Sequence, residues 1–224
     1  MLGASISRNS MLLGLFAIVS TAIISATFLQ TSEQISANIR HAEEQALFDI
    51  APKSRHNNIM LDDFVAVSDD QLLSLRKQKK IYIAKQNNIP VAVIIPATAR
   101  DGYTGDIDLI VGINTDGTVS GVRVLSHRET PGPGDAVDRK KSDWVEGFNG
   151  KSLNNPNIER WKVKKDKGVF DQFTGATITP RAVTKAVLQA LRYFEQHQQN
   201  IFQAQKTDKQ TITPPQTEEV IHHG

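Results

Sequence analysis

The chain has 224 residues, of which 39% are hydrophobic and 22% are charged, and 26 basic and 24 acidic side chains give a formal net charge of +2. This composition predicts one folded domain with additional segments, and it excludes a wholly disordered chain and a membrane protein of several spans. So small a charge predicts no nucleic-acid partner. Cysteine is absent, which excludes disulfides, thiol catalysis and cysteine-bound metal clusters, and the six scattered histidines form no metal-binding motif.

An uncharged apolar segment near the N-terminus predicts a membrane helix. Residues 9–32 carry no charged side chain, and the apolar part is long enough for a helix of roughly 30 Å, the thickness of a bilayer's hydrocarbon core. We expect a cytoplasmic N-terminus over residues 1–10 and an uncleaved transmembrane anchor over 11–30. Because Arg8 precedes the span, the positive-inside rule places the rest of the chain outside the cytoplasm. A cleaved signal peptide is the alternative, since small residues lie at Ser25 and Ala26.

The chain after the anchor divides into three predicted parts. Apolar residues recur at helical spacing from Ile35 to Ile50, so we expect residues 31–79 to form a helical, membrane-proximal segment. Residues 80–198 are expected to form the main domain. Residues 199–224 are rich in Gln, Thr, Pro and Lys and are predicted to be a disordered tail.

The main domain begins with four strand-like runs, which predict an antiparallel β-meander. The runs are residues 81–84, 91–95, 107–113 and 118–125. Residues 114–117, with the sequence NTDG, form a good hairpin turn between the last two runs, and Gly121 is a candidate for a β-bulge.

Helical patterns follow the strands. After the Gly- and Pro-dense residues 126–135, a helix-like stretch covers residues 136–148. The clearest helix follows Pro180, and one apolar stripe runs along it: Val183, Ala186, Val187, Ala190, Leu191 and Phe194. Thr179 is the predicted N-cap of this helix. The expected fold class is α+β, an antiparallel β-meander packed with helices and preceded by a single N-terminal transmembrane helix.

The segment directly before this helix favours an anion site. Gly175 permits a tight turn, Ala176 is small, and Thr177 and Thr179 supply hydroxyl groups beside the helix N-terminus. Free backbone N–H groups and a partial positive charge at such a terminus suit a phosphate. On the residues alone a purely structural interpretation stays open, in which Thr179 caps the helix while Thr174 and Thr177 stabilise the turn.

The motif Asp171-x-x-Thr174-Gly175-Ala176-Thr177 resembles the D-x-x-[S/T]-G-A-T motif of proteins that carry covalently attached FMN. In that family the last threonine of the motif, here Thr177, is esterified through the flavin phosphate.

Two upstream segments also resemble this family. Residues 102–107 together with Asp116-Gly117 resemble its first hairpin, and the segment His127-x-Glu129-Thr130-Pro131-Gly132 resembles its second flavin-facing loop. The loop departs from the family pattern at Pro133, where leucine is expected.

The resemblance implies that residues 80–198 form a covalent-FMN-binding domain, with FMN as the covalent cofactor and Thr177 as its attachment point. It implies that the following residues form the rest of the flavin site: Asp171, Thr174, Gly175, Ala176, Thr179, Glu129, Thr130, Pro131 and Gly132. No catalytic or metal-binding residue is expected.

Two family members fit this layout. One is the G subunit of the Rnf-type ion-translocating electron transport complex, and the other is the C subunit of the sodium-translocating NADH:quinone reductase; the short chain favours the first. The resemblance then implies an electron carrier on the periplasmic side of a bacterial inner membrane, working with other membrane subunits. It also implies a separate flavin transferase that uses FAD and recognises Asp171 and Gly175.

Three alternatives remain: a cofactor-free binding or scaffold module on a membrane anchor, a sensor that binds flavin reversibly, and an enzyme in its own right, for which no nucleophile or acid–base pair is visible. Tyr103 and Trp144 are expected to be core or interface aromatics rather than flavin-stacking residues. Glu129 has an alternative role as the partner of Arg128 or of a lysine.

Overall fold

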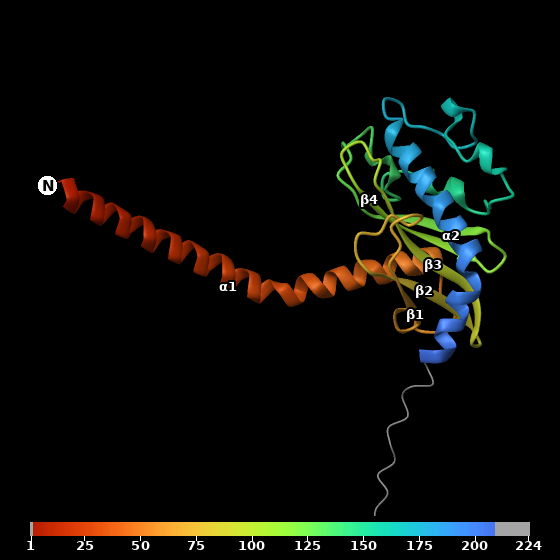
Figure 1. Ribbon diagram of the computed structural model, residues 1–224, viewed down its shortest axis with the longest axis horizontal. Coiled ribbons are helices and arrows are strands. Elements are labelled where there is room, and N and C mark those ends of the chain that lie inside the picture. The colour runs from red at the N-terminus through yellow and green to blue at the C-terminus, as the bar shows by residue number, and fades with distance from the viewer. Residues whose placement is uncertain (1, 209–224) are drawn as a thin grey trace, which may run out of the picture. The chain divides into compact units, whose positions relative to one another are not determined.

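The computed structural model describes residues 2–208 (Figure 1). It divides after Gln45 into an N-terminal helical unit and a larger unit that contains the sheet. The N-terminal unit consists of most of helix α1 (Leu2–Ile50). Within it, Asn9–Ser32 has a mean hydropathy of 2.2 and none of this stretch is buried, so it is not a core helix. By length and composition it could cross a membrane.

Helix α1 ends at Ile50 because Pro52 follows shortly, and proline disfavours the helical conformation in the residue before it. The prediction of a helix across residues 31–79 is therefore wrong after this point. Residues 51–79 contain turns, a short 3-10 helix η1 (Met60–Asp62) and the strand β1 (Phe64–Val67). The placement of a domain boundary at residue 80 stays a prediction.

The sheet is an antiparallel meander, as predicted, but it has five strands rather than four, in the order β1-β2-β3-β4-β5. The four longer strands are β2 (Lys79–Gln86), β3 (Ile89–Ala99), β4 (Ile107–Asn114) and β5 (Val119–Ser126). Each of these strands contains one of the four predicted runs. The one exception is Thr118, the first residue of the last run, which lies just before β5.

The turn between β2 and β3 and the turn between β4 and β5 both contain residues that tolerate a positive φ. Asn87 and Asn88, with φ of 52° and 64°, form the two-residue connection between β2 and β3. Gly117, with φ of +83°, closes the predicted turn, and its N–H donates to the Asn114 carbonyl at 2.9 Å. The register between β4 and β5 shifts beside Gly121, which confirms the predicted irregularity there.

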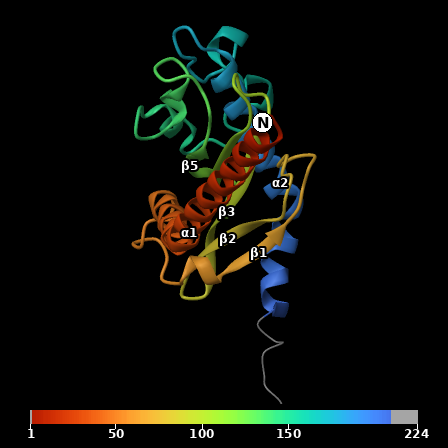
Figure 2. The same cartoon turned by 90° about the vertical axis from the view of Figure 1, so that its left-hand side faces the viewer.

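Helix α2 (Ile178–Asp208) covers one face of the sheet (Figures 1 and 2). All six residues of its predicted apolar stripe are buried. The helix continues ten residues beyond the predicted domain end because Ile201, only 4% exposed, and Phe202 extend the stripe against the core. The prediction of disorder is therefore wrong for residues 199–208, and residues 209–224 lie outside the described residues.

The last turn of α1 packs on the opposite face of the sheet. Leu47, Ile50 and Met60 form a second buried cluster there with residues of β2, β3 and β4. Ile50 lies over Gly112 and Gly121, which are paired across β4 and β5. A Cβ atom on Gly112 would lie 2.1 Å from the Cγ2 of Ile50, so the absence of a side chain creates the room for this contact.

The helix-like stretch predicted over residues 136–148 is not one helix: it contains two short 3-10 helices, η2 (Asp135–Val137) and η3 (Trp144–Phe148), and the extended backbone at Asp138 ends the first of them. Two more, η4 (Ile158–Arg160) and η5 (Lys164–Asp166), follow before α2. Trp144 packs edge-on against Phe148 and Phe173, with ring centroids 5.2 and 5.1 Å apart. Its Nε1–H donates to the Asp171 carbonyl at 2.8 Å and so fixes the start of the segment that leads into α2.

Candidate functional site

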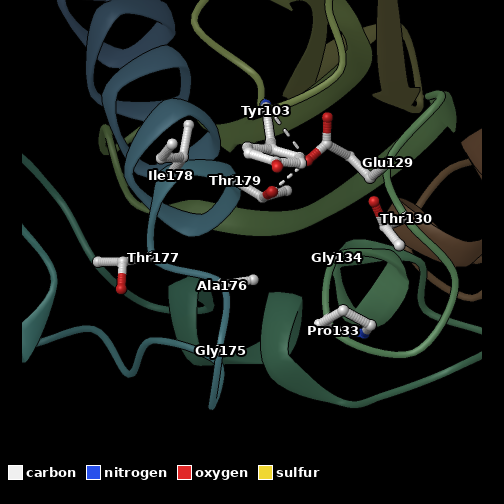
Figure 3. Close-up of a pocket in the computed structure, with 10 residues that line it drawn as sticks. All are labelled: Tyr103, Glu129, Thr130, Pro133, Gly134, Gly175, Ala176, Thr177, Ile178 and Thr179. Carbon is white, nitrogen blue, oxygen red and sulfur yellow. Dashed lines mark hydrogen bonds between the residues drawn. The ribbon is translucent and has the colours of Figure 1, made fainter.

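A cavity of about 250 Å³ lies where the loop after β5 meets the turn before α2 (Figure 3). Its lining residues are Tyr103, Glu129, Thr130, Pro133, Gly134, Gly175, Ala176, Thr177, Ile178 and Thr179. In Figure 3, Thr177 lies on one side of the cavity and Glu129 on the other. The fold thus brings together the two segments predicted from the sequence, although they lie some fifty residues apart in the chain.

Thr177 stands directly before the first residue of α2. Gly175, with φ of +81°, makes the preceding turn, and the Ala176 N–H donates to the Phe173 carbonyl at 3.2 Å. The first N–H groups of a helix have no partner within the helix, and the first turn of α2 contains no acidic side chain. Since Thr177 and Ile178 both line the cavity, the positive end of the α2 dipole lies at its wall.

Thr179 does not act as the predicted N-cap, because α2 begins at Ile178 and places Thr179 inside the first turn. Its side chain is fully buried, and its hydroxyl donates a short hydrogen bond to Oε2 of Glu129. The prediction assigned this hydroxyl to the helix N–H groups, whereas its partner belongs to a distant loop.

Glu129 is 4% exposed and is held by neutral donors. Its Oε1 accepts the Thr104 N–H at 2.9 Å, and its Oε2 accepts the Tyr103 N–H at 3.3 Å in addition to the Thr179 hydroxyl. Burial raises the pKa of Glu129, but these hydrogen bonds together outweigh burial, and the pKa lies below its usual value. The alternative role for Glu129, pairing with Arg128 or a lysine, is not the one observed.

Two glycines allow the chain to fold closely around Glu129. A Cβ atom on Gly102 would lie 2.2 Å from the Gly105 carbonyl oxygen and 3.1 Å from Oε1 of Glu129. Gly134 donates its N–H to the Thr130 carbonyl at 2.9 Å, and a Cβ atom on it would lie 3.1 Å from the Cβ of Glu129. Gly134 was not among the predicted site residues, although the Pro-Gly-Pro-Gly run that contains it signals a tight turn.

Four predicted site residues lie outside the cavity lining. Asp171 forms an ion pair with Lys164 at 2.5 Å on the surface, and Thr174 is exposed. Pro131 and Gly132 are also exposed, at the tip of the loop. The roles of these four residues stay predictions.

The two predicted core or interface aromatics differ in their surroundings. Trp144 packs against Phe148 and Phe173, as expected of a core or interface aromatic. Tyr103 is 65% exposed and lines the cavity, so it is not a core residue. Ile178, 46% exposed, also lines the cavity, and sequence reasoning missed it because a lone isoleucine between two threonines carries no pattern of its own.

Two family models match the chain. A model described as the RnfG N-terminal region matches residues 1–50, and one described as an FMN-binding domain matches residues 102–192, which include every residue of the cavity lining. The G subunit of the ion-translocating oxidoreductase complex from Pseudoalteromonas atlantica is 45% identical over 199 residues, which cover 89% of this chain and 93% of the relative. The chain belongs to the family of G subunits of ion-translocating oxidoreductase complexes.

Other G subunits give the same result. The protein of the same name from Vibrio cholerae serotype O1 is 46% identical over 197 residues, covering 88% of this chain and 94% of the relative. The one from Pseudomonas aeruginosa is 44% identical over 197 residues, covering 88% and 92%. The resemblance to the G subunit, preferred over the C subunit of the sodium-translocating reductase, is thereby confirmed.

Proposed function

We propose that this chain is a membrane-anchored electron carrier that holds FMN through a phosphoester to Thr177. The observation that carries the proposal is the position of Thr177, on the wall of the cavity and directly before the N-terminus of α2. A phosphate esterified there would lie beside the free N–H groups and the positive dipole end of the helix. The match of residues 102–192 to an FMN-binding domain supports FMN as the group.

The shape of the cavity fits a partly enclosed flavin. At about 250 Å³ it is smaller than the roughly 300–1,000 Å³ of cavities that enclose a small molecule. Tyr103 and Ile178 line it while remaining substantially exposed, so part of a bound ring would stay accessible. FMN supplies one- and two-electron chemistry, and an accessible ring suits transfer to a partner protein better than turnover of an enclosed substrate.

The partners follow from the same proposal. The relatives are named as subunits of an ion-translocating oxidoreductase complex, and we expect this chain to join other membrane subunits of such a complex. A separate, transient flavin transferase would donate FMN from FAD. The side chain of Asp171 is 68% exposed and Gly175 is also exposed, so both are accessible to such an enzyme.

The stretch Asn9–Ser32 is proposed as a single-pass anchor in the bacterial inner membrane, with the sheet-containing unit on the periplasmic side. The motive for this orientation is Arg8, the one charged residue that precedes the span. Alkaline phosphatase fused after Gly224 should be active in intact cells. Activity restricted to a reporter that works in the cytoplasm would reject the orientation.

Intact mass spectrometry tests the cofactor proposal. The full chain, produced with and without a flavin transferase, should differ by the mass of one FMN less one water. A colourless protein of unchanged mass would support the cofactor-free module. A yellow protein that loses its colour on denaturation would support the reversible sensor.

A further inference from the structure

The Glu129 carboxylate is a buried charge on the wall of the proposed flavin cavity. It is 4% exposed, lines the cavity, and accepts hydrogen bonds from the N–H groups of Tyr103 and Thr104 and from the Thr179 hydroxyl. These donors stabilise the ionised form. All of them are neutral, so the formal charge of −1 stays in place.

Other carboxylates of the same unit are balanced differently. Glu146 forms ion pairs with Arg123 at 3.0 Å and with Arg139 at 2.9 Å. Asp63 pairs with the Lys85 ammonium at 2.9 Å. Among the side chains that the structure describes, no lysine, arginine or histidine forms an ion pair with Glu129.

The buried, unpaired charge of Glu129 acts on any group that the cavity holds. Water screens charges strongly, whereas the effective dielectric constant near a buried site is several-fold lower, so the same separation gives a larger interaction energy. Adding electrons to a group in this cavity brings negative charge towards a fixed negative charge. The carboxylate therefore opposes reduction of whatever the cavity holds.

We propose that Glu129 is a tuning residue whose fixed negative charge lowers the reduction potential of the flavin bound at this cavity. The inference rests on the proposed function, since it needs FMN on Thr177. Two-electron reduction of the flavin takes both electrons from the redox partner and its protons from solvent. Glu129 supplies neither and keeps its charge throughout.

The test is the midpoint potential of the flavinylated full chain in detergent, measured by spectroelectrochemistry at pH 7. Glu129→Gln preserves the shape of the side chain and removes the charge. We expect at least a tenfold increase in the equilibrium constant for reduction, which is about 30 mV upward for a two-electron couple. Glu146→Gln is the matched control, because this carboxylate is outside the cavity lining and already ion-paired, and it should shift the potential less than half as much.

A second variant changes the potential in the opposite direction. Thr179→Val removes a donor to the carboxylate but keeps the charge, which becomes less well neutralised, so the potential should fall. Thr179→Ser retains the hydroxyl and should restore the wild-type potential. If Glu129→Gln does not fold, the fall with Thr179→Val and its rescue by serine decide the question.

The outcomes separate this inference from the proposed function. In-gel flavin fluorescence on each sample establishes whether the cofactor is attached. Attached flavin with an unchanged potential in Glu129→Gln and Thr179→Val overturns the tuning role alone. An upward shift in both variants indicates a general loosening of the cavity and also overturns it. A wild-type chain without attached flavin overturns both proposals.

Discussion

Thr179, in the first turn of α2, donates its hydroxyl proton to the carboxylate of Glu129, fifty residues earlier in the chain. This contact joins the helix that follows Thr177 to the loop that forms the opposite wall of the cavity. Thr104 donates to the same carboxylate from a third segment, the connection between β3 and β4. The geometry of the site therefore depends on one buried acceptor shared by three parts of the chain.

The first prediction concerns the stability that this contact provides. Thr179→Val should reduce the free energy of unfolding by about 1.5–3 kcal/mol, because it removes a hydrogen bond to a buried charged group. Thr184→Val is the matched control, since Thr184 is also buried on α2 but its hydroxyl has no hydrogen-bond partner among the described residues. Thr184→Val should leave the free energy of unfolding nearly unchanged. Urea unfolding of both variants measures the difference, and equal losses would show that the contact contributes nothing.

The second prediction is a pH dependence with a defined sign. Burial raises the pKa of Glu129, but its hydrogen bonds lower the pKa by more than burial raises it. The pKa in the folded protein therefore lies below the usual value of 4.5. A depressed folded pKa means that the ionised group stabilises the fold above about pH 4.5 and that this stability is lost as the pH falls through the folded pKa.

Glu129→Gln should therefore flatten the loss of unfolding free energy between pH 5 and the acid limit of stability, as measured by urea titrations at a series of pH values. Glu146→Gln should act in the same direction. Burial also raises the pKa of Glu146, and Asn149, Arg123 and Arg139 lower it below its usual range. Parallel pH profiles for wild type and both variants would contradict this account.

The third prediction concerns the packing of Ile50, in the last turn of α1, on the sheet. Gly112→Ala places a Cβ atom 2.1 Å from Ile50 Cγ2 and 2.4 Å from Ser120 Oγ, so these side chains must move. Overpacking of this kind costs about 1–3 kcal/mol. Gly147→Ala is the control, because no described atom outside its chain neighbours and its own short helix lies within 4 Å of its Cβ position. Thermal unfolding should separate the two variants, and a Gly112→Ala protein as stable as the control would show that the sheet face is not tightly packed.

The fourth prediction concerns the segment that leads to Thr177. Trp144→Phe keeps an aromatic ring against Phe148 and Phe173 but removes the N–H that donates to the Asp171 carbonyl. We expect faster proteolysis between residues 171 and 177, because the start of the segment loses its tether. Trp161→Phe also deletes an indole donor, to the Ser152 carbonyl, and should leave this segment as resistant as in the wild type.

Local patterns predicted much of this fold. The short runs of β-branched and other apolar residues in β2 to β5 and the 3.6-residue stripe of α2 are local sequence features, so each could be predicted without tertiary information. Strand β1 could not, because its four residues are too short to show a period and acquire their order by pairing with β2. The end of α1 was predictable in principle from Pro52, but the apolar periodicity before it was extended too far.

The candidate site was predictable in part for a similar reason. Gly175, Ala176 and Thr177 form a contiguous motif at a helix start, and the cavity lies there. The hydrogen bond from Thr179 to Glu129 has no local signature, and it reversed the expectation that Thr179 caps the helix. Tyr103 was predicted to be a core or interface aromatic, because the sequence does not reveal that its segment opens onto a cavity.

The central claim is that Thr177 alone carries the flavin. Thr177→Val keeps the branched shape and removes the side-chain oxygen, so the fold should survive. Thr179→Val is the matched control, because Thr179 lies two residues further along the same segment, outside the flavin-attachment motif, and its hydroxyl donates to Glu129. The decisive measurement is in-gel fluorescence of the denatured full chain after production with a flavin transferase. The account predicts fluorescence from wild type and Thr179→Val and none from Thr177→Val. Fluorescence that persists in Thr177→Val would contradict it.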